Sequence, residues 1–174
     1  MRASSPDHPV DAVQGCLEAC RRCDAVVTAV CEQDPAAFPA VGPHLRHSVD
    51  HFRLLLDGWA AGFVDYDARP RDLRLERDPV AVRDALSSIA STLGALVAAD
   101  LPRPLSVSQS VASGRPPRVS PSCLERELAF LSGHTIHHIA LMVMSGREAG
   151  LKIPAWLAVA YSTEAHRDTF AAQR

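Results

Sequence analysis

The sequence Gly133-His134-Thr135-Ile136-His137-His138-Ile139-Ala140 lies in the middle of a long apolar run. No helix breaker interrupts its flanks, and apolar residues recur every three or four positions, so we predict one buried helix from about Pro121 to Gly146. His134 and His138 are four residues apart, which places both imidazoles on one helix face, whereas His137 points towards another. This helix therefore presents two histidines side by side.

A second histidine cluster lies in Gly42-Pro43-His44-Leu45-Arg46-His47-Ser48-Val49-Asp50-His51, so six of the eight histidines fall in two short stretches. Proline is favoured in the first turn of a helix, and the apolar pattern predicts that a helix runs from Pro43 to about Ala61. On that helix His44, His47 and His51 lie within roughly 60° of one another. All three side chains can therefore point inward together.

Imidazoles on apolar helix faces are costly to bury without a partner. Two histidines spaced i, i+4 on one helix, with one from a neighbouring helix, can hold a divalent transition metal such as zinc, nickel, iron or manganese. Three protein ligands leave positions for water or substrate, which is typical of a catalytic site. The His-Glu-x-x-His pattern of zinc proteases is absent, because no Glu follows His134.

Length and composition restrict the class of protein. The chain has 174 residues, 47% of them hydrophobic, and a formal charge of −2, which gives no electrostatic reason to expect nucleic acid. No signal peptide or apolar run of about 20 residues is evident, so we expect no membrane partner. Five cysteines without a secretion signal favour reduced thiols and a cytoplasmic protein.

The remaining pattern predicts an all-α single domain over residues 1–174, with 1–8 disordered. Its four substantial helices form a four-helix bundle, with a long crossover between the third and fourth helices and a short C-terminal helix. Residues 105–120 are predicted to be irregular or to form two strands, and Asp65–Asp72 to be a loop over the end of the second helix. The predicted helices span about 10–32, 43–61, 78–100, 121–146 and 155–171.

The two histidine motifs resemble those of the DinB/YfiT superfamily. Leu45–Phe52 and Ser132–Ala140 carry the likeness, together with the order of the helices and the Asp65–Arg69 loop. The resemblance covers roughly residues 10–165. It implies a four-helix bundle of DinB type, often dimeric, with a three-histidine metal site.

Carried over to this chain, the resemblance implies His47, His134 and His138 as metal ligands. His51 is the rival for the ligand on the second helix, or a fourth ligand, and the sequence does not separate His47 from His51. Relatives include thiol S-transferases, a mycothiol-dependent isomerase and the iron-binding domain of sulfoxide synthases. The last group has Glu in the HxxxHxE motif where this chain has Ala140.

The resemblance favours a metal-dependent transferase that moves a low-molecular-weight thiol, its co-substrate, to a small-molecule electrophile. The alternatives are a metal-dependent hydrolase, a non-haem iron oxidoreductase and a non-catalytic metal-binding stress-response protein. His51 and Glu127 are candidates for a general base or a partner of a ligand, because Glu127 lies seven residues before His134 on the same face. The substrate is expected to enter beneath the Asp65–Arg74 loop and the 100–120 segment, and a homodimer is plausible.

Other polar groups have simpler interpretations. Cys16, Cys20 and Cys23 share the spacing of a radical-SAM motif, but on an amphipathic helix they are best interpreted as small buried hydrophobes. Cys123 lies near a helix start, where its thiol pKa can be depressed. Asp50 is expected to pair with an arginine on the bundle surface.

Overall fold

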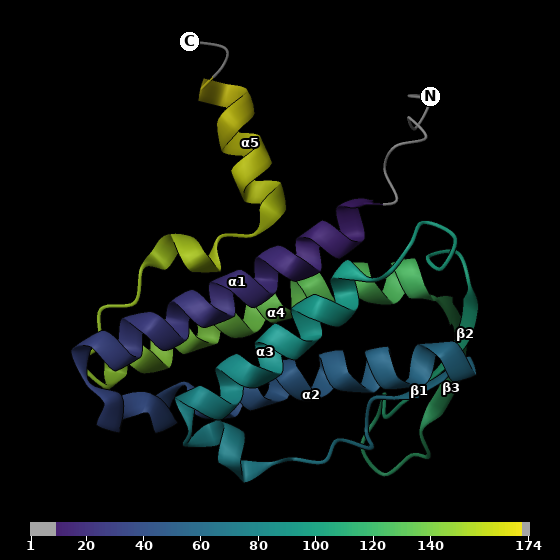
Figure 1. The fold of residues 1–174 in the computed structure, drawn as a ribbon, viewed down its shortest axis with the longest axis horizontal. Helices are drawn as coiled ribbons and strands as arrows, with labels where there is room; N and C mark the ends of the chain where they lie inside the picture. The colour runs from purple at the N-terminus through teal and green to yellow at the C-terminus, as the bar shows by residue number, and fades with distance from the viewer. Residues whose placement is uncertain (1–9, 172–174) are drawn as a thin grey trace.

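The computed structural model describes residues 10–171, which are mostly helical with one small sheet (Figure 1). The predicted disorder of residues 1–8 lies outside the described part. The α-helices are α1 (Val10–Gln33), α2 (Gly42–Gly58), α3 (Pro79–Gly94), α4 (Leu124–Glu148) and α5 (Tyr161–Ala171). The strands are β1 (Phe63–Asp65), β2 (Pro104–Gln109) and β3 (Arg118–Cys123). Short 3-10 helices are η1 (Pro35–Ala40), η2 (Trp59–Ala61), η3 (Leu73–Glu76) and η4 (Ala155–Ala158).

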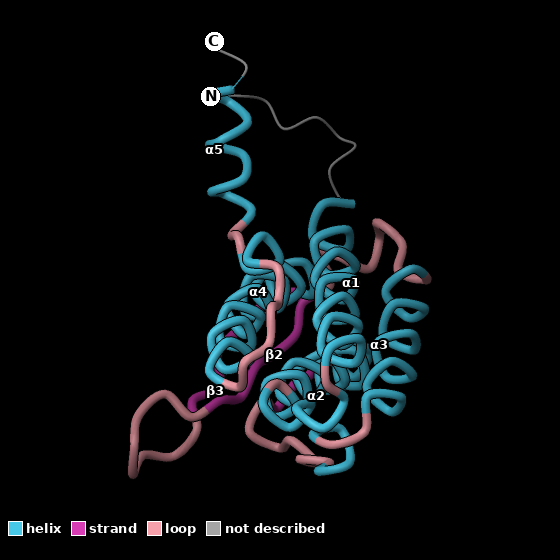
Figure 2. Tube along the Cα trace, turned by 90° about the vertical axis from the view of Figure 1, so that its left-hand side faces the viewer, coloured by secondary structure: helices cyan, strands magenta, loops and turns pink. Residues whose placement is uncertain are grey.

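Helices α1 and α2 each pack against both α3 and α4, so the four long helices enclose a common core (Figure 2). Their apolar stripes supply the largest fully buried side chains, including Phe52 of α2 and Leu128 and Leu131 of α4. The helical periodicity of the sequence therefore correctly predicts which faces are buried. Helix α5 projects away from these four helices (Figure 1).

A three-stranded sheet at one end of the helices corrects the all-α prediction. Strand β1 pairs in parallel with β2, which pairs antiparallel with β3. The predicted excursion at 105–120 is therefore a hairpin with a long connection, and β1 joins it from the segment after α2. Strands this short are hard to recognise because their pairing partners are distant in the chain.

The same pairing corrects the predicted start of the fourth helix. Pro121 pairs with Ser106 within the sheet and β3 continues to Cys123, so α4 begins at Leu124 rather than near Pro121. Ser122 does not cap the helix, because its hydroxyl donates to the Glu127 carboxylate. Cys123 is the N-cap residue and makes no side-chain capping bond.

Two other boundaries differ from prediction. Helix α3 ends at Gly94 instead of about residue 100. Residues 97–100 form a turn in which the Asp100 carboxylate accepts a hydrogen bond from the Val97 amide. The predicted loop after the second helix includes the end of β1, and the Asp72 carboxylate caps η3.

Helix α2 is fixed closely against η3, which helps to orient its histidines. A Cβ atom at Gly42 would lie 2.1 Å from the Glu76 carbonyl oxygen, so only glycine permits this approach. The Glu76 carboxylate lies 2.8 Å from the Arg46 guanidinium on the next turn of α2. These contacts hold the start of α2 against η3, in the segment between β1 and α3.

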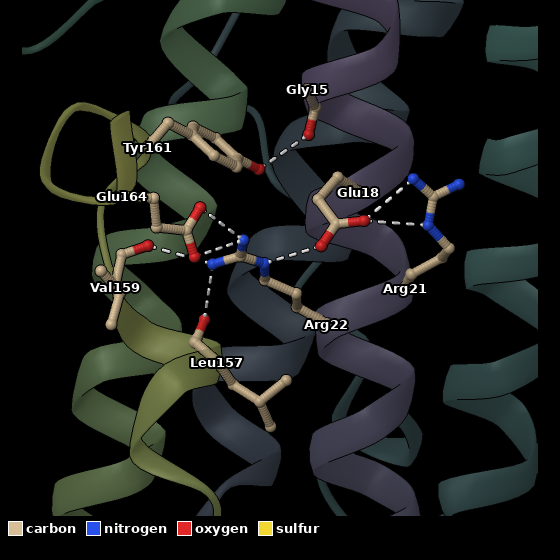
Figure 3. Close-up of polar contacts among 8 residues, drawn as sticks. All are labelled: Gly15, Glu18, Arg21, Arg22, Leu157, Val159, Tyr161 and Glu164. Atoms are coloured by element: carbon tan, nitrogen blue, oxygen red, sulfur yellow. Dashed lines mark hydrogen bonds and ion pairs between the residues drawn. The ribbon is translucent and has the colours of Figure 1, made fainter. Parts of the chain in front are cut away.

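The C-terminal segment is anchored to α1 through Arg22, whose side chain is buried (Figure 3). The Arg22 guanidinium donates to Glu18, to both carboxylate oxygens of Glu164 and to the carbonyls of Leu157 and Val159. Tyr161 donates to the carbonyl of Gly15, one turn before Glu18. We call Glu18, Arg22 and Glu164 the Arg22 clamp.

Of the described helices, α4 has the length and composition of a membrane-spanning segment, a test that core helices also pass. In its most apolar window, 44% of the residues are buried inside the fold. Helix α4 also packs along both α1 and α2. The expectation of no membrane partner remains a prediction.

Candidate metal centre

The two histidine stretches meet where α2 packs against α4. His47 and His134 approach most closely, with their Nε2 atoms 2.9 Å apart. His44 and His138 form a second pair across the same interface, with their Nδ1 atoms 3.1 Å apart. Histidines of the two stretches are thus in contact across the helix interface, and His137, which was expected to point towards another face, is exposed.

Three of these histidines form the tightest group. Ring nitrogens of His47, His51 and His134 all lie within 4.8 Å of one another, close enough to hold one metal ion. We call these residues the histidine trio. His138 lies beside the trio, with its ring centroid 4.2 Å from that of His47. The structure therefore groups both rival ligands of α2, His47 and His51, with His134.

Hydrogen bonds assign the tautomers of the trio. His51 Nδ1 lies 2.9 Å from the carbonyl oxygen of His47 and must donate to it, which leaves His51 Nε2 with a free lone pair. The Arg69 guanidinium lies 2.7 Å from His47 Nδ1, and because arginine only donates, that nitrogen must accept. His47 then carries its proton on Nε2 and donates to His134 Nε2.

Burial keeps these imidazoles neutral. Burial, together with the charge of the neighbouring histidines, lowers the pKa of His134 to about 4, of His138 to about 3 and of His47 to about 2. Burial also lowers the pKa of His51. Neutral imidazole is the form that binds a metal, so at neutral pH the cluster offers ligands without first losing protons.

Two aromatic rings enclose the trio. Tyr66 stacks on His51 with ring centroids 5.3 Å apart, and Phe130 stacks on His134 at 5.2 Å. Both rings restrict the imidazole orientations, which preorganises the site. Tyr66 comes from the segment after β1, whose pairing with β2 extends to a hydrogen bond from the Tyr66 amide to Ser108.

Glu127 occupies a different position from the one predicted for it. Its fully buried carboxylate accepts hydrogen bonds from Tyr66, Ser122 and Arg126, and no bond to a histidine is among these contacts. Glu127 is therefore linked to the trio indirectly, through Tyr66, which stacks on His51, and through Arg126, which lies over Phe130. The reason is the sheet, which brings Ser122 and Tyr66 to the side of α4 where Glu127 projects.

Asp50 is also placed differently, because it is buried rather than on the surface. Neither of its carboxylate oxygens has a hydrogen-bond partner within the described residues, and the same holds for Nε of Arg69 and of Arg46. Burial raises the pKa of Asp50, while Arg46, the Arg71 amide, Arg53 and Arg69 lower it. Unsatisfied buried charges are rare in folded proteins, so this region beside the trio is unusual.

The cysteines agree with the simpler interpretation. Cys16, Cys20 and Cys23 are buried in the core, and burial raises the pKa of Cys20 to about 12 and the pKa of the other two thiols as well. Protonated thiols of this kind are unreactive. Cys123 is half-buried, next to Ser122 at the start of α4.

Sequence reasoning did not connect Tyr66 or Arg69 to the histidines. Both lie in the segment between α2 and α3, which was predicted to be a loop over the end of the second helix. The Asp65-Tyr66-Asp67-Ala68-Arg69 motif of the family resemblance was the available signal, but no spacing rule connects it to His47. The contacts arise because β1 returns this segment along the end of α2.

Comparison with known proteins adds one partial match. No family model matches the chain, and no solved structure matches it. A segment of "FK506-binding protein 5" of Rhizopus delemar is 32% identical over 104 residues, which is 59% of this chain. The match spans only 27% of that protein's length.

Proposed function

We propose that the protein is a divalent-metal-dependent enzyme of the DinB type, most plausibly a transferase of a low-molecular-weight thiol. The observation that carries this proposal is the histidine trio, with three ring nitrogens within 4.8 Å on two helices that pack together. The four long helices that enclose a common core are what a DinB-type bundle requires. The family membership and the thiol chemistry rest on the sequence resemblance.

The donor set suits a borderline divalent metal such as zinc, nickel, iron or manganese. All three residues of the trio are neutral imidazoles, and His51 Nε2 has no competing hydrogen bond among the contacts of the described residues. We assign the metal to His47, His51 and His134. His138, paired with His44, is then a neighbour of the site instead of the ligand expected from the resemblance.

If a metal were bound by these three imidazoles, positions would remain open for a thiol or a water, whose pKa would be lowered so that it becomes nucleophilic at neutral pH. This chain's own residues orient the ligands: the His47 carbonyl fixes the His51 ring, and Phe130 and Tyr66 hold His134 and His51 from their outer faces. Glu127 is too fully bonded to act as the base. A thiol whose pKa is lowered in this way would need no separate base.

A pocket of about 560 Å³ lies on the hairpin side, and no histidine of the trio is among the residues that line it. It is lined by β2, β3 and the first turn of α4, including Gln109, Cys123 and Arg126, and it borders Glu127. Pockets of this size accommodate small organic ligands. The Arg126 guanidinium stacks over Phe130, 5.4 Å from its centroid, which connects the pocket to the ring that covers His134.

The test is metal content and zinc affinity of the purified protein and of three histidine variants on α4 and α2. We expect about one metal per chain in wild type and a loss of at least about 100-fold in zinc affinity for His134→Ala and His51→Ala. His138→Ala should retain most of the affinity. His137→Ala, exposed on the same helix, is the matched control and should match wild type.

Loss of metal in His138→Ala but not in His51→Ala would reassign the site to the ligands implied by the resemblance. Absence of metal binding in wild type would refute the metal centre.

If wild type binds zinc, the zinc-loaded protein should transfer a low-molecular-weight thiol to an electrophile such as a haloarene or epoxide. Hydrolysis without thiol consumption would favour the hydrolase, and no turnover with any electrophile would favour the non-catalytic alternative.

A further inference from the structure

The histidine trio is not equally prepared for a metal. His51 and His134 carry their protons on Nδ1, which leaves the Nε2 lone pair of each available to a metal. His47 has the opposite arrangement, because Arg69 donates to its Nδ1 and its Nε2 must carry the proton. His47 is therefore in the wrong tautomer to bind a metal through Nε2.

Metal binding at His47 Nε2 creates a conflict with Arg69. A neutral imidazole that uses the Nε2 lone pair for a metal carries its one proton on Nδ1, which then faces the Arg69 guanidinium as a second donor. Two donors cannot form a hydrogen bond. Arg69 must then leave His47 Nδ1, or His47 must lose its proton and bind as an imidazolate.

A destination for Arg69 lies beside the trio. Asp50 is adjacent in sequence to His51, its side chain is buried, and neither carboxylate oxygen has a partner within the described residues. Nε of Arg69 is likewise buried without a partner. Rotation of the guanidinium towards Asp50 would satisfy three of the four unpartnered buried side-chain atoms at once.

Arg46 is the competing partner for Asp50, because its Nε is also buried without a partner. One terminal nitrogen of its guanidinium lies 2.8 Å from the Glu76 carboxylate, and this contact directs the Arg46 side chain towards η3. Arg53 is also on α2, and no contact of its guanidinium with the trio is found among the described residues. Arg69 alone among these arginines hydrogen-bonds a histidine of the trio.

We infer that Arg69 is a metal-coupled switch, which holds His47 in the non-binding tautomer in the free protein and moves to Asp50 when a metal binds. The net proton count of His47 does not change, since one proton moves from Nε2 to Nδ1 by exchange with solvent. Asp50 is thus a positioning residue that sets metal affinity without touching the metal. This inference rests on the proposed metal centre.

The same movement has a consequence for the substrate. Arg69 is only partly buried, and in the free protein its guanidinium covers the outer edge of His47. Its withdrawal to Asp50 neutralises both charges and leaves Nδ1–H of His47 as a free donor. The metal-loaded site would therefore present a neutral surface on the His47 side instead of a cation.

The experiment measures zinc affinity by chelator competition for wild type, Asp50→Asn and Arg69→Met, and for the double variant. Asp50→Asn keeps the shape but removes the charge that receives Arg69, so zinc affinity should fall about tenfold, within the range found for outer-shell partners of metal ligands. In the Arg69→Met background the same Asp50→Asn change should alter zinc affinity less than about twofold. Asp57→Asn, exposed on the same helix, is the matched control and should be neutral.

A second measurement needs no variant. Ring-nitrogen NMR of the wild type should place the His47 proton on Nε2 without metal and on Nδ1 with zinc bound. An imidazolate His47, without a ring proton, would show that Arg69 stays in place and would overturn the switch. Equal effects of Asp50→Asn in both backgrounds would also overturn it, because Asp50 would then act through Arg46 or through the fold.

The outcomes separate this inference from the proposed function. Wild-type protein that binds zinc normally, with Asp50→Asn unchanged, removes only the switch. Wild-type protein that does not bind zinc removes the metal centre, and the switch with it.

Discussion

Two arginines of this protein, the buried Arg22 and the partly buried Arg69, are used in opposite ways. Every guanidinium nitrogen of Arg22 donates to a carboxylate or a carbonyl, and the clamp it forms attaches the C-terminal segment to α1 (Figure 3). Arg69 donates to one histidine while its Nε remains unpartnered and buried, next to an unpartnered Asp50. A fully satisfied network favours a single structure, whereas a partly satisfied one has a second arrangement available.

The contrast suggests where stability and function are located. Arg22 connects segments 135 and 142 residues apart through contacts that leave no donor free, so we expect it to contribute to stability and not to chemistry. The region of Asp50 and Arg69 lowers stability by leaving buried charges without hydrogen bonds. Such a cost is typical of functional sites, which real proteins compensate elsewhere.

The largest effect is expected from Arg22→Met. Glu18 and Glu164 lose their partner and the carbonyls of Leu157 and Val159 lose their donor, so the free energy of unfolding should fall by about 3 kcal/mol. Both glutamates are about a third exposed, which keeps the loss at the lower end for a buried ion pair. Urea denaturation measures the loss, and zinc affinity should not change.

Arg21→Met is the matched control for the clamp. Arg21 bonds the same Glu18, but its side chain is 64% exposed, so the free energy of unfolding should change by less than about 0.5 kcal/mol. A large loss in this control, or a fall in zinc affinity with Arg22→Met, would contradict the separation of the two regions.

An intermediate effect on stability is expected from Tyr66→Phe, a change that tests how stability and metal affinity are separated near the trio. The change removes the hydroxyl that donates to the buried Glu127 at 2.9 Å and should lower the free energy of unfolding by about 1.5 kcal/mol. The aromatic ring that stacks on His51 is retained, so zinc affinity should remain within about twofold of wild type. Isothermal titration with zinc, alongside urea denaturation, separates the two effects. A tenfold loss of affinity would place Glu127 in the metal network through Tyr66.

The smallest effect concerns acid pH. Hydrogen bonding to Arg22 lowers the pKa of Glu18 below its ordinary value of 4.5, so the folded state binds fewer protons than the unfolded state. The clamp's contribution is therefore present above about pH 4.5 and is lost as pH falls through the lower folded pKa. Because Glu18 is partly exposed, the change is expected to be about 0.5 kcal/mol.

Glu18→Gln tests that pH dependence. Its urea-unfolding free energy should be lower than that of wild type at pH 7 and should approach it as the pH falls below 4. If the difference in unfolding free energy between the two proteins stayed constant across this range, protonation of Glu18 would not be what weakens the Arg22 clamp.

Much of the metal centre could be predicted from local periodicity. A helix repeats every 3.6 residues, so the spacings of His44, His47 and His51 and of His134 and His138 determine which imidazoles share a face. The apolar positions between them determine that these faces are turned inward. The paired histidine faces and the exposed position of His137 follow from that rule.

The residues that adjust the site could not be predicted in the same way. Glu127 was placed beside the histidines because it is seven residues before His134, but the Tyr66 hydroxyl, 61 residues away in sequence, binds its carboxylate instead. Asp50 was expected to pair with an arginine on the bundle surface, and it is buried instead. Both errors come from a sheet with strands of three and six residues, which carry little signal alone.

The helices, their buried faces and the two rows of histidines could thus be predicted from the sequence, because helical periodicity is a local property. The tertiary structure decided that His51 rather than His138 completes the trio, that Arg69 fixes the tautomer of His47, and that Asp50 is buried without a partner. These depend on the angle at which α2 meets α4 and on the pairing of β1 with β2. Contacts between distant segments follow from how the whole chain packs, and no local spacing encodes them.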